Sequence, residues 1–190
     1  MKYDIILADP AWKFSDGLKM SKVKRGASSQ YATMTAEQIG CLPIWKLAAD
    51  NSLLALWCPS SLLKDGLFVM HKWGFAQKQI FTWVKMTKSG GLAFGMGRQF
   101  RGCTEHALIG TQGSLKPSSK SERNACLTPA LRHSEKPPNL HECLDRMYPK
   151  ANKLELFARR SRPGWDCIGL ECDGPYGGKD IQSWAAEVLG

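Results

Sequence analysis

Short apolar runs alternate along this chain with segments of helical periodicity, and this alternation predicts an α/β fold with a mostly parallel sheet. The runs are rich in Ile, Leu, Val and Trp, as buried strands are. We predict strands over 3–8, 52–58, 75–85, 105–110, 126–131 and 153–158. We predict helices over 35–49, 59–73, 138–147 and 180–189. One domain is expected over residues 1–190, because this length can bury a single core.

The first predicted strand ends at Asp9-Pro10-Ala11-Trp12. Pro10 cannot donate a hydrogen bond to a sheet, so the strand should stop there. In open α/β sheets, ligands bind at the carboxyl ends of the strands, which would place an acid, a proline and an indole at a ligand-binding edge. The tetrapeptide also fits an ordinary Asp-Pro turn followed by a packed tryptophan.

Asp9 and Pro10 suit chemistry on the exocyclic amine of a base. Such an amine is a poor nucleophile because its lone pair is delocalised into the ring. A carboxylate that accepts one N–H group localises that lone pair, and the Pro10 carbonyl can accept the second N–H. Trp12 offers a flat face to a base that has left its stack. Positioning and electrostatics then carry the step without a covalent intermediate.

Further motifs follow in order along the chain. They are Tyr31-Ala32-Thr33-Met34, Leu56-Trp57, Trp73-Gly74-Phe75, Trp83-Val84-Lys85, Glu105-His106, Lys136-Pro137, Glu155-Leu156-Phe157-Ala158-Arg159, Trp165 and Asp173-Gly174. The tetrapeptide is similar to Asp-Pro-Pro-Trp. With these motifs, the chain resembles the adenine-N6 methyltransferases related to the eukaryotic messenger-RNA N6-methyladenosine writer, which also occur in bacteria and phages. The resemblance covers nearly the whole chain.

The resemblance implies a Rossmann-like S-adenosylmethionine-dependent methyltransferase fold, with helices on both faces of the sheet. The target-binding half precedes the cofactor-binding half, which is a circularly permuted motif order. The catalytic residues implied are Asp9, Pro10 and Trp12. The cofactor-binding residues implied are Asp9, Lys136, Arg159 and Glu171, with Lys136 on the carboxylate of the methionine moiety and Arg159 near the ribose. Tyr31 and Glu105 match residues near the target, although Glu105 also fits an ordinary strand start.

The chain departs from the family pattern at several positions. Ala11 replaces the second proline, but the carbonyl that matters belongs to Pro10, so we expect activity to survive. Ser161, Arg162 and Leu170 replace polar residues on the cofactor side. Family roles are therefore carried over on that side only to Arg159 and Glu171.

Two glycine-containing basic loops flank the predicted ligand edge. The first, over 13–30, contains Lys24 and Arg25, and the second, over 86–102, contains Arg98, Arg101 and two phenylalanines but no acid. Basic loops with interleaved aromatic residues suit a nucleic-acid strand, although most charged loops are only solvated. We therefore predict substrate binding by these four cations.

Composition narrows the class of partner. The chain has 26 Lys plus Arg against 17 Asp plus Glu, a net charge of +9, which favours a polyanion over a membrane surface. Seven scattered cysteines without a CxxC pair indicate free thiols in a reducing cytoplasm. No apolar run reaches the roughly 18 residues of a membrane span, and no signal peptide is expected. Cys103 and His106 have a zinc-like spacing without a second pair, so no metal is predicted.

We therefore expect methyl transfer from S-adenosylmethionine to adenine N6. DNA is favoured as the substrate because no RNA-binding zinc fingers or partner subunit are encoded. The alternatives are the same reaction on RNA, an inactive nucleic-acid-binding subunit of methyltransferase fold, and methylation of a cytosine amine.

Overall fold

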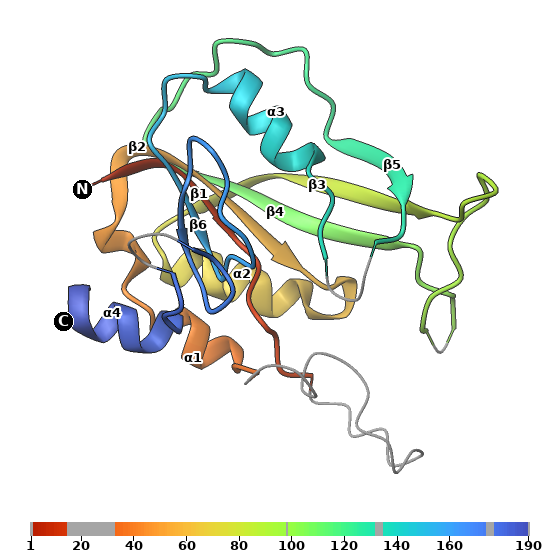
Figure 1. Cartoon of the computed structure of the whole chain (residues 1–190), viewed down its shortest axis with the longest axis horizontal. Coiled ribbons are helices and arrows are strands. Elements are labelled where there is room, and N and C mark those ends of the chain that lie inside the picture. The colour runs from red at the N-terminus through yellow and green to blue at the C-terminus, as the bar shows by residue number, and fades with distance from the viewer. Residues whose placement is uncertain (1, 15–32, 98, 132–134, 174–176, 190) are drawn as a thin grey trace.

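The computed structural model describes residues 2–14, 33–97, 99–131, 135–173 and 177–189 (Figure 1). The strands are β1 Tyr3–Ala8, β2 Ala48–Cys58, β3 Ala76–Met86, β4 Thr104–Gln112, β5 Ala125–Pro129, β6 Lys153–Leu156 and β7 Asp166–Ile168. The α-helices are α1 Ala36–Gly40, α2 Leu63–Lys72, α3 Asn139–Met147 and α4 Ile181–Leu189. Short 3₁₀ helices lie at Ile44–Lys46 and Ser60–Leu62. The predicted α/β class is confirmed.

The described strands form one seven-stranded sheet in the order β5-β3-β4-β2-β1-β6-β7. β1 lies near the middle and pairs in parallel with both β2 and β6. β4 runs antiparallel to its neighbours β2 and β3, whereas β5 and β7 are parallel to theirs. The sheet is thus mixed but mostly parallel, as in a Rossmann-like methyltransferase fold.

Helices cover both faces of the sheet (Figure 1). Side chains alternate along β1, so that Ile6 and Ala8 join the core beneath α1, α2 and α4, while Ile5 and Leu7 join the core beneath α3. Both faces of β1 are therefore buried, which explains why its sequence is a continuous apolar run rather than an alternating one.

The predicted helix over 35–49 is wrong in its length. Thr35 does form the capping box with Gln38, as its sequence predicts, but α1 ends at Gly40. Pro43 cannot continue a helix, because it lacks the N–H group. The chain then forms a short 3₁₀ turn and enters β2 at Ala48, which pairs with Tyr3.

Three tryptophans of the quoted motifs lie in the core. Trp57, Trp73 and Trp83 are each at most 1% exposed. The Trp73 indole donates to the Ile39 carbonyl at 3.0 Å and so ties α2 to α1. The Trp83 indole donates to the Thr128 carbonyl at 3.3 Å and ties β3 to β5.

The antiparallel direction of β4 decides which residues meet at the ligand edge. β1, β2 and β3 present their carboxyl ends there, whereas β4 presents its amino end. Glu105, near the start of β4, consequently lies opposite Trp83, near the end of β3. No helix among the described residues is long and apolar enough to span a membrane.

The central position of β2 predicts a stability effect. Leu54 is fully buried between Ile6 and Gly110, so Leu54→Ala should lower the free energy of unfolding by about 2–5 kcal/mol. Leu127→Ala is the matched control, because Leu127 is 65% exposed, and it should change that free energy by less than about 0.5 kcal/mol. Urea denaturation measures both, and equal effects would contradict this assignment of the core.

Candidate active site

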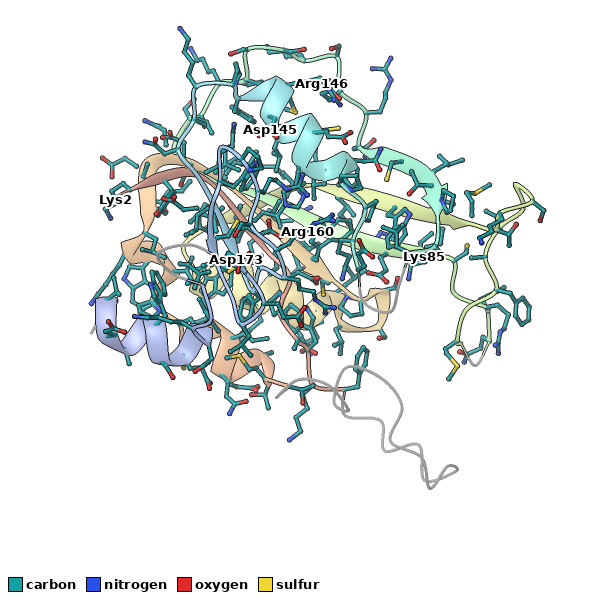
Figure 2. The ribbon with its side chains drawn as sticks, viewed as in Figure 1. Lys2, Lys85, Asp145, Arg146, Arg160 and Asp173 are labelled. Carbon is teal, nitrogen blue, oxygen red and sulfur yellow. The ribbon has the colours of Figure 1, made fainter. Side chains whose placement is uncertain are left out.

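Four charged side chains meet at the carboxyl edge of the sheet. Asp9 follows β1, Lys85 lies near the end of β3, Glu105 lies near the start of β4, and Lys136 precedes α3. Figure 2 shows Lys85 close to the point where β3 leads into the segment before β4. The charges alternate along this row, so each anion has a cation as its neighbour.

Lys136 is the centre of the row. Its Nζ donates to both carboxylate oxygens of Asp9, each at 2.9 Å, and lies 3.4 Å from Oε2 of Glu105. The side chains of Lys136 and Asp9 are only 16% and 19% exposed. The ammonium also lies 5.7 Å from the centre of the Trp57 ring, which adds a cation–π contact.

Glu105 connects this pair to Lys85. One carboxylate oxygen accepts a hydrogen bond from Lys85, and the other faces Lys136. Lys85 in turn lies 4.8 Å from the centre of the Trp83 ring. The row therefore rests on two buried indoles, Trp57 and Trp83, which belong to the core.

Asp9, Glu105 and Lys136 have shifted pKa values. Burial raises the pKa of Asp9 above its ordinary value, and the Lys136 cation opposes that rise. Burial alone would also raise the pKa of Glu105, but the cations Lys136 and Lys85 together lower it. Burial would lower the pKa of Lys136, but the two carboxylates raise it. The Lys136 ammonium and the Glu105 carboxylate thus keep their charges at neutral pH, and Lys136 favours the charged form of Asp9.

The tetrapeptide after β1 differs from the sequence prediction at Trp12, whose side chain is buried. Trp12 is only 4% exposed, packs in the core, and donates its indole N–H to the Trp57 carbonyl at 2.9 Å. With so little of its surface exposed, Trp12 offers no open face to a base, and the stacking role predicted for it does not fit this structure. The Pro10 carbonyl accepts the Trp12 backbone N–H at 2.9 Å and keeps a second lone pair.

A narrow cleft opens beside Asp9, between the ends of β1 and β6. Its wall is formed by Leu7, Asp9, Trp57, Glu135, Lys136, His141, Glu155, Phe157, Arg159, Arg160 and Arg162. Arg159 is near enough to Asp9 to lower the pKa of that carboxyl. Phe157 has a φ of 62°, a left-handed conformation that is costly for a residue with a side chain and turns the chain sharply at the end of β6.

The predicted cofactor residues are therefore partly brought together. Asp9, Lys136 and Arg159 line one cleft. Glu171 follows β7 on the surface and does not line it. Among the predicted substrate residues, Glu105 joins the charged row, and Arg101 lies on the exposed segment between β3 and β4. Lys24, Arg25, Tyr31 and Arg98 lie outside the described residues.

Sequence reasoning missed three residues of this region. Lys85 belongs to the motif Trp83-Val84-Lys85, but no role was assigned to it from the sequence. Its place near the end of a strand, where ligands bind, was the signal that could have identified it. His141 is 5% exposed, its Nε2 lies 2.9 Å from Oε2 of Glu155, and both line the cleft. Their sequence separation of 14 residues gave no indication of this pairing. No cluster of His, Cys, Asp or Glu that could hold a metal occurs in the part of the chain that the structure describes.

Comparison with known proteins identifies relatives over nearly the whole chain. The profile of the MT-A70 family matches residues 3–171. The type II methyltransferase M.MunI from Mycoplasma sp. is 29% identical over 188 residues, covering 90% of this chain and 78% of the relative. The human N(6)-adenine-specific methyltransferase METTL4 is 30% identical over 185 residues. The human N(6)-adenosine-methyltransferase catalytic subunit METTL3 is 24% identical over 178 residues.

The alignments cover 89% and 91% of this chain but only 37% of METTL4 and 29% of METTL3. MT-A70 methyltransferases use S-adenosylmethionine as methyl donor and act on nucleic acids. The match to the family profile extends from β1 to the residues after β7 and includes all four members of the charged row. This chain therefore belongs to the MT-A70 family of N6-adenine methyltransferases.

Proposed function

We propose that this protein transfers a methyl group from S-adenosylmethionine to the N6 amine of adenine in DNA. The observation that carries the proposal is the partly buried Asp9 carboxylate, held by Lys136 at the carboxyl edge of the sheet beside a cleft. A carboxylate in this position can accept an amine N–H and localise the lone pair of the nitrogen.

Asp9 and the free lone pair of the Pro10 carbonyl form the proposed amine site. The nitrogen loses a proton as it gains the methyl group, and a carboxylate whose pKa is raised by burial can accept that proton. Glu105 and Lys85 hold Lys136 in place from the other side. Trp12 supports the site from within the core, because its indole N–H donates a hydrogen bond to the carbonyl of Trp57.

The cleft residues fit S-adenosylmethionine by charge. The cofactor supplies a methyl group on a positively charged sulfur, and its amino-acid end carries one ammonium and one carboxylate. Lys136 can bind that carboxylate, Asp9 and Glu155 can accept from the ammonium, and Arg159 can contact the ribose region. Glu171 stays in the proposal as a ribose ligand, because its carboxylate follows β7 at the same edge of the sheet.

The strand order supports a circularly permuted arrangement. β1, which carries Asp9, is the first strand of the chain, and it pairs with β6, which comes late and leads into Phe157 and Arg159. The proposed amine site and the proposed cofactor site are thus adjacent in space and far apart in sequence. All seven cysteines are free, which suits the cytoplasm that we propose as the location.

DNA is favoured over RNA by the relatives. The chain aligns with 78% of a type II methyltransferase but with only 29% of the METTL3 catalytic subunit. RNA is the second candidate, because METTL3 and several plant relatives are N(6)-adenosine methyltransferases by name.

Asp9→Asn should abolish methyl transfer, while the cofactor still binds through the other cleft residues, Lys136, Glu155 and Arg159. The amide keeps the shape of the side chain but loses the negative charge that binds the amine N–H. Asp50→Asn, on the exposed part of β2, is the control and should be fully active. Labelled cofactor measures transfer, and calorimetry measures binding. An active Asp9→Asn enzyme would refute the amine site, whereas a parent protein that binds no cofactor would point to a non-catalytic subunit.

Lys136→Met should raise the pKa of Asp9 further, because the effect of burial is then opposed only by more distant cations. The folded state of the variant then holds the Asp9 proton more tightly than the unfolded chain does. The variant should therefore lose stability relative to the parent as the pH rises from the ordinary carboxyl range through the raised pKa. Carbon-13 carboxyl NMR measures the pKa, with Lys179→Met, from an exposed ion pair, as the unchanged control. An unshifted Asp9 would contradict the proposed coupling.

Matched DNA and RNA oligonucleotides should be methylated at different rates, with DNA preferred. A protein that distinguishes the two must respond to the 2′-hydroxyl or to the helix form. Mass spectrometry of the nucleosides after the reaction identifies both the base and the sugar. Methyladenosine from RNA as the dominant product would reverse the choice of substrate, and methylcytosine would change the base.

A further inference from the structure

The segment between β3 and β4 presents large apolar side chains to solvent. Leu92, Phe94, Met96 and Phe100 are 62%, 78%, 79% and 88% exposed. Figure 1 shows this segment extending clear of the sheet and of the helices that cover it. Exposed apolar side chains gathered on one projecting segment indicate a binding surface rather than scattered surface residues.

The described part of this segment has an internally bonded backbone. Thr87 N–H donates to the Gly91 carbonyl at 2.7 Å, and Gly95 N–H donates to the Gly102 carbonyl at 3.0 Å. A Cβ on Gly95 would lie 2.3 Å from the Gly102 carbonyl oxygen, so the two arms approach as closely as only glycine permits. The exposed rings are therefore carried on a folded hairpin.

The hairpin starts and ends beside Lys85, the outermost member of the charged row. Lys85 donates its backbone N–H to the Cys103 carbonyl at 2.7 Å and accepts from Ala93 at 2.8 Å. The Lys85 side chain bonds to Glu105, which is within one contact of the Lys136–Asp9 pair. The base of the hairpin is thus connected to Asp9 through Glu105 and Lys136, and the exposed rings lie on the same connection at the ligand edge.

The charge and the ring chemistry of the hairpin indicate a nucleic acid. Its sequence from 86 to 102 contains Lys88, Arg98 and Arg101 and no acid. The Arg101 guanidinium carbon lies 4.4 Å from the centre of the Phe94 ring, so a cation for phosphate and a flat face for a base occur together. This one-sided positive charge complements the phosphates of a nucleic-acid backbone.

We propose that Phe94 and Phe100 act as a wedge that enters the base stack of duplex DNA next to the target adenine. The inserted ring replaces the stacking that the adenine loses when it leaves the helix, and Arg101 binds the adjacent phosphate. The adenine N6 amine, which is otherwise occupied in base pairing, then becomes available to Asp9. This inference rests on the proposed function and specifies paired DNA as its substrate.

The test compares paired and unpaired targets. A random-sequence duplex pool methylated by the parent protein is first sequenced to find a target. The parent, Phe94→Ala and Phe100→Ala are then assayed on that duplex, and on the same duplex with the target adenine opposite an abasic site. Phe68→Ala is the matched control, because Phe68 is an exposed phenyl on α2 that also lies beside a cation, Lys72.

The wedge variants should lose at least about tenfold in kcat/KM on the paired duplex and less than about threefold on the unpaired one. The fluorescence of 2-aminopurine at the target position should rise with the parent and with Phe68→Ala, but not with the wedge variants. Equal losses on both duplexes, or no loss, would overturn the wedge. A shift in sedimentation caused by the Phe substitutions would instead assign the surface to a second copy of the chain, and would also overturn it.

A failure of the proposed function gives a different result. In that case the parent transfers no methyl group to either duplex or to single strands. The fluorescence measurement still decides the wedge. A pool of random-sequence duplexes with 2-aminopurine in place of adenine reports opening at any sequence that the protein binds, and base opening needs neither cofactor nor transfer.

Discussion

The ammonium of Lys136, held between the carboxylates of Asp9 and Glu105, is the contact on which the arrangement of this site depends. Its partners come from residues 127 and 31 positions away along the chain. All three groups are shielded from solvent, so removing one would leave an uncompensated charge in a poorly solvated place. The folded backbone must therefore bring three distant segments to one edge of the sheet together. Lys85 extends the row because its ammonium compensates the second oxygen of Glu105.

The sheet topology makes that meeting possible. Parallel strands bring the ends of β1 and β3 to one edge, but they would send the start of β4 to the opposite edge if β4 were parallel too. Reversing β4 puts Glu105 beside Lys85 and Lys136. The same reversal makes the connection between β3 and β4 a hairpin at the ligand edge. One strand direction thus determines both the charge row and the position of the exposed phenylalanines.

Residue patterns predicted most of the elements, because buried parallel strands and amphipathic helices leave strong local signals. The run before Asp9 and the positions of Lys136 and Arg159 were predicted, and they meet at one cleft. The direction of β4 could not be predicted, because an apolar run carries no polarity. The sequence left Trp12 open between a stacking face and a packed side chain, since the partner that buries it is the carbonyl of Trp57, which is distant in sequence. Lys85 pairs with Glu105 only because β4 runs antiparallel to β3.

The Asp9 carboxylate is paired with one ammonium, that of Lys136, and can still bind an incoming amine. Burial raises its pKa, and the Lys136 cation opposes that rise. Each carboxylate oxygen accepts one hydrogen bond from Lys136 and keeps a further lone pair for another donor. An incoming amine offers such donors, and in the proposed reaction each N–H that Asp9 accepts would favour its charged form. Once the nitrogen is methylated, one donor is lost and the carboxylate again favours a proton. A partly buried, singly paired acid is therefore suited both to bind the amine and to take up the proton that methyl transfer releases.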